Sequence, residues 1–113
     1  KFKILLISSR KNHDKWKLPG GGIESNESIT TTAMRETLEE AGVVGRVENY
    51  IGDYENPVKK TLTYAVSFIS KDVYDTWDEN DRNREWFSIC IALKKLEHHD
   101  REMLFDYLYS VVL

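Results

Sequence analysis

The chain has 113 residues, a length that accommodates one domain with one modest hydrophobic core. Its hydrophobic content of 41% and charged content of 31% are ordinary for a folded protein, and its formal net charge of -3 argues against broad, sequence-independent nucleic-acid binding. No apolar run approaches the roughly 18 residues that cross a bilayer, so we expect no membrane partner. We interpret residues 1–113 as a single domain.

The single cysteine, Cys90, excludes an intrachain disulfide bond. Together with the lack of a leader-like segment, this favours a reducing compartment, and we expect a cytoplasmic location that can extend to the nucleus. Cys90 lies between two isoleucines, and no charged neighbour in the sequence would activate its thiol. We therefore predict that this side chain is buried and unreactive.

The start of the chain predicts a strand, a loop and a break in regular structure. The short apolar run at residues 2–8 is typical of a buried strand. Residues 10–17 are polar and basic and contain one tryptophan, Trp16, which we assign to the core or to a pocket wall. Pro19 and the three glycines at residues 20–22 then exclude regular structure and allow unusual backbone angles.

A helix is predicted from about Ser28 to Ala41. Ser25, Asn26 and Ser28 are all suitable N-cap residues, because their side-chain oxygens accept hydrogen bonds from the first backbone N–H groups of a helix. Gly42 is well placed to end the helix, since glycine adopts the left-handed conformation that terminates many helices.

The second half of the chain predicts further strands and helices. The clearest strand runs from Thr61 to Ser70, where apolar and polar residues alternate. A charged connection at residues 72–83 follows. The other predicted elements are strands at residues 46–54 and 85–89 and helices at residues 92–96 and 101–112. Because strands and helices do not alternate regularly, we predict an α+β or layered α/β/α domain.

The predicted helix at residues 28–41 separates acidic from apolar side chains. At 100° per residue, Glu36, Glu39 and Glu40 fall within an arc of about 100°. Arg35 lies beside Glu39 at a spacing of i, i+4, and Glu27 just precedes the helix, within reach of Arg35 or of free backbone donors. A broader, mostly opposite arc is assigned to the core and contains Ile29, Ala33, Met34, Thr37, Leu38 and Ala41.

Two interpretations of the acidic arc compete on energetic grounds. An exposed acidic surface is acceptable, since like-charge pairs at i, i+4 cost only about 0.2–0.5 kcal/mol. In a cleft, however, two carboxylates about 6 Å apart repel by roughly 3 kcal/mol at an effective dielectric constant of about 20. A divalent cation would offset that repulsion, and hard cations such as Mg²⁺ prefer carboxylate oxygen. Composition alone leaves both interpretations open.

The spacing of the residues favours the metal-binding interpretation. The stretch from residue 21 to residue 43 fits the pattern G-x5-E-x7-R-E-U-x-E-E-x-G-U, in which U is aliphatic, and thereby resembles the Nudix box. Only Thr37 departs, where an aliphatic residue is usual, and we expect this change to affect packing rather than chemistry. The matching residues are Gly21, Glu27, Arg35, Glu36, Glu39, Glu40, Gly42 and Val43.

The resemblance extends over essentially the whole chain. The phrases LLISSR, DKWKLPGGG, RETLEEAGV, REWFSI and LEHH are similar to those of the diphosphoinositol polyphosphate phosphohydrolases, a Nudix branch that also cleaves diadenosine polyphosphates. This resemblance implies a Nudix fold, an α/β/α sandwich around a mixed β-sheet. The branch usually has a basic segment and a strand before the point where this chain begins, so we expect the fold to lack that N-terminal strand. The resemblance also implies that the protein hydrolyses a phosphoanhydride bond with the help of Mg²⁺ or Mn²⁺.

The resemblance also implies a role for each residue of the box. Glu36 and Glu40 would be the main metal ligands, with the carbonyl of Gly20 as a further ligand, and Glu39 would be a ligand or the general base. Arg35 and Glu27 would orient the carboxylates of the helix. A phosphoanhydride is highly anionic, so attack by hydroxide is repelled until metal ions neutralise charge and make water more acidic.

Residues outside the helix must select the substrate. Arg10 and Arg84 match phosphate contacts of the family. Other basic side chains, including Lys59 and Arg82, are as consistent with ordinary surface charge as with a polyphosphate pocket. His98 and His99 open the last helical region, where a cap or surface role is expected. Trp86, like Trp16, is assigned to the core or a pocket wall. The residues predicted to contact the substrate are Ser9, Arg10, Gly20, Gly21, Gly22, Lys60 and Arg84.

The expected partner is a small-molecule polyphosphate. Leu62 stands where the branch has an arginine, and residues 1–113 do not include the basic segment that the branch has before this point, so both inositol pyrophosphates and dinucleoside polyphosphates stay open as substrates. Two alternatives remain: a hydrolase of nucleotides or mRNA caps, with capped RNA the one nucleic acid considered, and a Nudix domain that binds a phosphorylated ligand without cleaving it. The oligomeric state is open, although an unpaired strand edge at residues 2–8 could recruit another chain.

Overall fold

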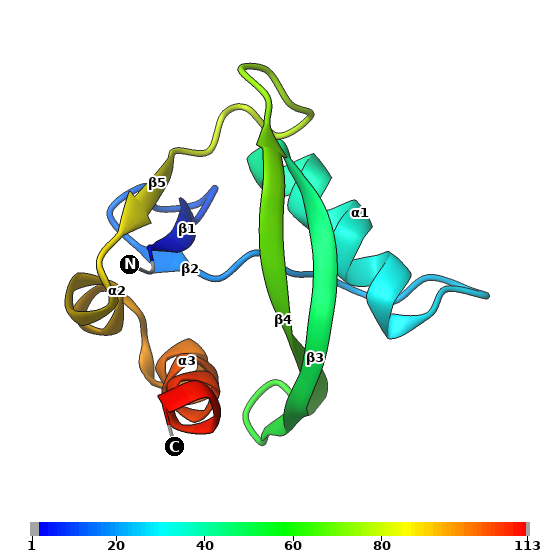
Figure 1. Cartoon of the computed structure of the whole chain (residues 1–113), viewed down its shortest axis with the longest axis vertical. Helices are drawn as coiled ribbons and strands as arrows, with labels where there is room; N and C mark the ends of the chain where they lie inside the picture. The colour runs from blue at the N-terminus through cyan, green and yellow to red at the C-terminus, as the bar shows by residue number, and fades with distance from the viewer. Residues whose placement is uncertain (1–2, 113) are drawn as a thin grey trace.

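A computed structural model describes residues 3–112 of the chain (Figure 1). Every helix and strand predicted from the residue pattern is present, with shifts at the ends that are usual for such predictions. The predicted first strand begins within the described residues at Ile4, and Phe2 lies outside them. The elements are β1 (Ile4–Ser8), β2 (Trp16–Lys17), α1 (Ile29–Ala41), β3 (Val43–Asn56), β4 (Thr61–Val73), β5 (Arg84–Phe87), α2 (Ile89–Lys95) and α3 (His98–Val112).

The strands form two sheets. β1 lies between β2 and β5 in a three-stranded sheet, and β3 pairs with β4 in a long hairpin. The expectation of one mixed sheet is corrected here, since all strand pairs within residues 3–112 are antiparallel and the parallel contact there is an isolated bridge between Trp16 and Leu96. The short turn at residues 57–60 explains the β3–β4 pairing, because a tight turn can join only antiparallel strands.

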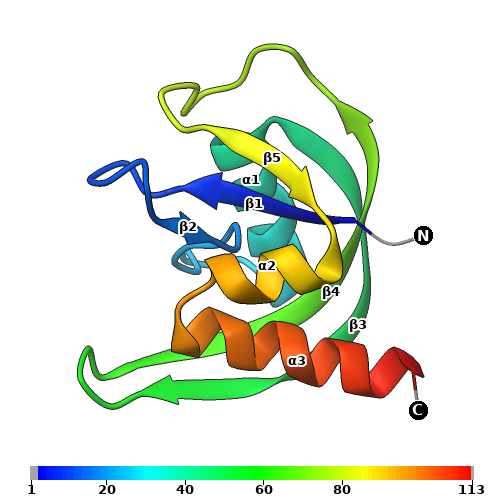
Figure 2. The ribbon, with the colours of Figure 1, turned by 90° about the vertical axis from the view of Figure 1, so that its left-hand side faces the viewer.

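Helices cover the strands on two sides. α1 contacts the β3–β4 hairpin, while α2 contacts β1 and β5 on the other side, as Figure 1 shows. In Figure 2, α2 and α3 lie next to each other in front of the strands. The expected α/β/α layering is therefore present, and its layers position α1 against the strands along one side.

β1 supplies side chains to the hydrophobic core on both of its faces. Successive strand residues point to opposite faces, so Leu6 and Ile7 enter different clusters, and both are 0% exposed. Ile7 packs with residues at the end of α1 and the start of β3. Leu6 packs with residues of β5, α2 and α3 and with the residue that follows α2, namely Phe87, Ala92, Leu104 and Leu96. Burial on both faces explains why the strand is a continuous apolar run.

The core-facing side of α1 differs from the prediction. Met34 and Leu38 are 42% and 41% exposed, whereas Glu40 is only 5% exposed. The helix is rotated so that part of its acidic arc faces the strands and the glycine turn instead of solvent. Thr37 is buried as expected, and its hydroxyl donates a hydrogen bond to the carbonyl of Ala33 at 2.7 Å.

The burial predicted for Cys90 is wrong, and of the two places predicted for Trp86 the core is excluded. Cys90 is exposed, because α2 begins at Ile89 and Cys90 lies on the outer side of its first turn. Trp86 is also exposed, at 38%, although Trp16 is half-buried and packs edge-on against Phe87 with ring centroids 5.1 Å apart. His98 is the first residue of α3, which begins three residues before the predicted helix at residues 101–112.

The predicted open edge of β1 is present in part. β2 pairs with only two residues of β1, Ile7 and Ser8, so the run from Ile4 to Leu6 pairs on one side with β5 and has no strand partner on the other within the described residues. No helix in the described part of the chain has the length and apolar character needed to cross a membrane.

Candidate active site

The two ends of α1 are determined by local residues, and they set the position of its glutamates. The Ser28 hydroxyl accepts a hydrogen bond from the backbone N–H of Thr31 at 3.1 Å, which identifies the N-cap among the three predicted candidates. Gly42 ends the helix in the left-handed conformation, with φ at 67°, and its N–H donates to the carbonyl of Leu38 at 2.9 Å. The glutamates therefore lie on a helix that is capped at both ends.

Arg35 is the centre of the acidic cluster. Its Nε donates to Glu27 Oε2 at 2.6 Å and its Nη2 donates to Glu27 Oε1 at 3.0 Å, which makes a bidentate pair. Nη2 also donates to the carbonyl of Gly22 at 2.9 Å, and Nη1 lies 3.3 Å from Glu39 Oε1 and 3.4 Å from Glu36 Oε2. The hydrogen bond from Arg35 lowers the pKa of Glu27 to about 2. Arg35 thus joins the glycine turn to three glutamates.

Glu36 lies against the glycine turn. A Cβ atom added to Gly21 would collide with the carboxylate of Glu36, so only a glycine leaves room for this side chain. Burial raises the pKa of Glu36, and the negative charges of Glu39 and Glu79 act in the same direction, against the opposing charge of Arg35. This carboxylate therefore lies where further positive charge would stabilise its ionised form.

Glu40 is held from both sides. Its Oε1 accepts a hydrogen bond from the backbone N–H of Gly20 at 2.8 Å, and its Oε2 lies 3.6 Å from Nη2 of Arg82. Burial raises the pKa of Glu40, opposed by the hydrogen bond from Gly20. The contact brings the backbone of Gly20, a predicted ligand, next to the predicted ligand Glu40.

Two residues of this region were not assigned to it from the sequence. The backbone N–H of Glu79 donates to the carbonyl of Glu39 at 2.9 Å. Arg82 is 9% exposed, donates from Nε to Glu79 Oε1 at 2.9 Å and from Nη1 to the carbonyl of Ser8 at 2.8 Å. From the sequence, Arg82 is as consistent with ordinary surface charge as with a phosphate contact. The charged connection that contains Glu79 and Arg82 has no fixed residue spacing that would identify either residue.

The donor set of the cluster fits a hard divalent cation in kind. Carboxylate and carbonyl oxygens are the ligands that such ions prefer, and Glu36 occupies a cradle that a Cβ at position 21 would fill. Within residues 3–112, however, no three or more His, Cys, Asp or Glu side chains are already arranged around a common point. Instead the carboxylates of Glu36, Glu39 and Glu40 each contact an arginine.

The predicted substrate contacts outside the box are dispersed. Arg10 pairs with Asp81, with its Nε 2.9 Å from Oδ2, and Ser9 donates its backbone N–H to the carbonyl of Lys15 at 2.8 Å. Lys60 lies in the turn between β3 and β4 with a positive φ of 55°, and within the described residues it has no hydrogen bond or ion pair to α1.

Arg84 serves the end of α1 in this structure. Its Nη1 donates to the carbonyl of Ala41 at 2.6 Å, and its guanidinium stacks over the ring of Trp77 at 4.0 Å from the centroid. A Cβ added to Gly42 would collide with both Trp77 and Arg84, so the three groups are tightly packed. Arg84, predicted as a phosphate contact, therefore stabilises the last turn of α1 in this structure.

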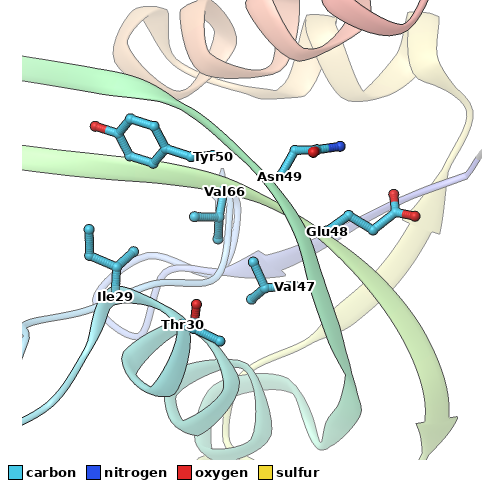
Figure 3. A pocket seen from close by; sticks show the side chains of 7 residues that line it. All are labelled: Ile29, Thr30, Val47, Glu48, Asn49, Tyr50 and Val66. Carbon is cyan, nitrogen blue, oxygen red and sulfur yellow. The ribbon is translucent and has the colours of Figure 1, made fainter.

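An open hollow of about 480 Å³ lies away from these residues. Figure 3 shows that it is bounded by the first turn of α1 and by β3 and β4. None of the residues predicted to bind metal or substrate lines it. Its lining consists of Ile29, Thr30, Val47, Glu48, Asn49, Tyr50 and Val66.

Comparison with known proteins finds diphosphoinositol polyphosphate phosphohydrolases among the relatives of this chain. Diphosphoinositol polyphosphate phosphohydrolase 2 from Homo sapiens and from Mus musculus are each 37% identical over 100 residues, which cover 86% of this chain and 56% of theirs. Diphosphoinositol polyphosphate phosphohydrolase 3-alpha from Mus musculus is 38% identical over 101 residues, 62% of its length. The chain thus spans little more than half the length of these relatives.

Solved structures and a family model agree on the fold. A Nudix hydrolase from Nitrosomonas europaea superposes with a TM-score of 0.81 at 25% identity, covering 96% of this chain and 81% of that one. The Ap4A hydrolase of C. elegans superposes with a TM-score of 0.72 at 19% identity, over 98% of this chain and 87% of that one, a likeness of fold alone. The model of the NUDIX domain matches residues 1–107. The chain therefore belongs to the Nudix family.

Proposed function

We propose that this protein is a metal-dependent pyrophosphohydrolase that cleaves phosphoanhydride bonds in diphosphoinositol polyphosphates, diadenosine polyphosphates or both. The observation that carries the proposal is the cluster in which Arg35 joins Glu27, Glu36 and Glu39 beneath the glycine turn. The names of relatives that are 37% identical support the class of substrate. An intact set of three helix carboxylates supports hydrolysis over ligand binding alone.

Nudix hydrolases generally use divalent metal ions, and Mg²⁺ or Mn²⁺ is proposed for this chain. Glu36, Glu40 and the carbonyl of Gly20 would hold the ion, with Glu39 as a further ligand or as the general base. When bound, the ion supplies positive charge against the phosphate oxygens and makes water more acidic.

The other residues of the cluster act on these carboxylates. Glu27 holds the guanidinium of Arg35 through two hydrogen bonds, so Arg35 keeps a defined position beside Glu36 and Glu39. The Gly20 N–H holds one oxygen of Glu40. Because the side chains are oriented before substrate arrives, little reorganisation is needed during the reaction.

The choice of substrate depends on few positive charges. Leu62, at the position where the branch carries an arginine, is 47% exposed and adds no charge to the surface of β4. Arg10 keeps an exposed guanidinium and remains the clearest candidate for a phosphate contact. A reducing, cytoplasmic location, predicted from the single cysteine, is proposed as well.

A substrate panel with and without Mg²⁺ tests the proposal. Diphosphoinositol polyphosphates, diadenosine polyphosphates and capped RNA are compared at equal concentration, and release of phosphate or nucleotide is followed. We expect hydrolysis of at least one of the first two classes, which EDTA abolishes and Mg²⁺ or Mn²⁺ restores. Cleavage of capped RNA alone, binding without turnover, or turnover that EDTA leaves unchanged would contradict the proposal.

A further inference from the structure

Arg10 and Asp81 form a bidentate ion pair between two connections of the chain. Arg10 follows β1, and Asp81 lies between β4 and β5. The Nε of Arg10 donates to Asp81 Oδ2 at 2.9 Å, and its Nη2 donates to Oδ1 at 3.2 Å. Arginine binds phosphate with the same two-bond geometry. The carboxylate of Asp81 therefore occupies the side of the guanidinium that a phosphate would use.

Arg10 differs from the two other arginines nearby in how firmly it is held. Arg82 is buried and contacts Ser8, Glu40 and Glu79, and Arg84 donates to a helix carbonyl while it stacks on Trp77. By contrast, the side chains of Arg10 and Asp81 are 52% and 50% exposed. Exposed ion pairs contribute little stability, so a multiply charged anion can displace Asp81 from Arg10 without unfolding anything.

The pair lies at the margin of the glutamate cluster. Nη1 of Arg10 is 3.6 Å from Glu79 Oε1, and the same oxygen accepts a hydrogen bond from Arg82, which contacts Glu40. A phosphate bound to Arg10 would therefore be linked through Glu79 to Arg82, which contacts the predicted metal ligand Glu40. The hydrogen bond from Arg10 also lowers the pKa of Asp81, and the charge of Arg10 acts in the same direction.

From this geometry we propose that Asp81 is a specificity-determining residue, an internal competitor that occupies Arg10 until a polyphosphate displaces it. The inference rests on the proposed function, because it takes Arg10 as a phosphate contact of that site. In this proposal Asp81 weakens the binding of anions to Arg10, and weakly charged anions do not displace it. Ligands with several adjacent phosphate groups are favoured as a result.

The test compares Asp81→Asn with the matched variant Asp78→Asn. Asp78 is exposed in the same connection and acts on Arg10 through its charge without a hydrogen bond, so its substitution controls for net charge. Binding of sodium tripolyphosphate to the full chain is measured by calorimetry in buffer with EDTA, and KM and kcat are measured separately with the substrate that the panel identifies.

We expect Asp81→Asn to tighten tripolyphosphate binding and to lower KM by about fivefold, the upper end for an exposed pair, with the effect in KM and not in kcat. Asp78→Asn is expected to change both by less than twofold. In an Arg10→Met background, Asp81→Asn should gain nothing, since the competition acts only through that guanidinium.

The inference is overturned if Asp81→Asn equals Asp78→Asn, if its gain persists without Arg10, or if neither protein binds tripolyphosphate. Failure of the proposed function looks different. In that case the wild-type chain hydrolyses no member of the panel, while the fivefold difference in tripolyphosphate binding is still observed.

Discussion

The two sides of the candidate site are built in different ways. The acidic side, from Gly20 to Glu40, comes from one continuous stretch, and its arginine is bound to the glycine turn and to three glutamates. The basic side, by which we mean the predicted substrate contacts Arg10, Lys60 and Arg84, is dispersed over three separate parts of the chain. Two of these side chains are occupied by partners within the protein, Asp81 and the end of α1. The predicted metal ligands are therefore positioned by local contacts, while two of the predicted substrate contacts are also used by the fold itself.

The largest effect is expected from the acidic side, with Glu40→Gln. The amide keeps an oxygen that can accept from Gly20, so the domain should stay folded, but the charge of the predicted ligand is lost. We expect turnover to fall by at least about a hundredfold, the scale for loss of a catalytic group. Steady-state kinetics with circular dichroism as a folding check measures this. Glu102→Gln on the exposed surface of α3 is the control, and near-normal turnover in Glu40→Gln would contradict the metal-binding role.

A second variant tests whether the glycine turn orients the acidic side. In Gly21→Ala the new methyl group must displace the carboxylate of Glu36, which is the flexible end of a side chain, so stability should hardly change. We expect kcat to fall by about tenfold, as for other changes that misorient a functional group. Gly52→Ala in β3, outside the predicted site, is the control, because a Cβ there meets only Tyr54, at ordinary contact distances of 3.6 Å or more. Equal activity of the two variants would show that the position of Glu36 does not matter.

The acidic side could be predicted well because its determinants are local. Ser28 and Gly42 identify the ends of α1, and the spacing of Glu27 and Arg35 brings them into contact once the helix forms. The exposure of Met34 and Leu38 could not be predicted, since a helical wheel assigns the whole apolar arc to the core. Tertiary contacts decide otherwise, because Gly20 and Arg82 provide partners that allow Glu40 to be buried.

The basic side was harder to predict, because its contacts form between connections distant in the chain. Nothing in the pattern of residues 72–83 shows that Glu79 lies beside the end of α1 or that Asp81 meets Arg10. The exposure of Cys90 was not predicted either, since its isoleucine neighbours suggested burial and the start of α2 at Ile89 was not recognised. The α+β class and the strands β1, β3, β4 and β5 followed from the pattern of residues, whereas β2 and the pairing of charged side chains required the three-dimensional structure.

Arg84 provides a test of the basic side with a smaller expected effect. Since its guanidinium donates to Ala41 and stacks on Trp77, Arg84→Met should lower the free energy of unfolding by about 2 kcal/mol. This corresponds to a decrease in Tm of about 8 °C for a domain of this size. KM should change by less than twofold, and Arg46→Met on the exposed surface of β3 is the control. An unchanged Tm with a tenfold higher KM would instead support the phosphate contact predicted from the sequence.

The smallest effect is expected from the pH dependence of the Glu27–Arg35 pair. Arg35 lowers the pKa of Glu27 from 4.5 to about 2, so the folded protein binds this proton less readily than the unfolded chain. The resulting stability is fully present above pH 4.5 and is lost as the pH falls through about 2. Urea unfolding between these pH values, in buffer with EDTA, should show a smaller loss of stability for Glu27→Gln than for the wild-type protein.

A double-mutant cycle isolates this contribution from the other carboxylates, which also titrate in acid. In an Arg35→Met background the pKa of Glu27 loses its main cause of depression, so Glu27→Gln should no longer change the slope of stability against pH. If Glu27→Gln changes that slope by the same amount with and without Arg35, the hydrogen bond from Arg35 is not what holds the Glu27 carboxylate in its ionised form. The acidic side would then depend on its backbone contacts, such as the hydrogen bond from the N–H of Glu24 to Glu27 at 2.9 Å, more than on its central arginine.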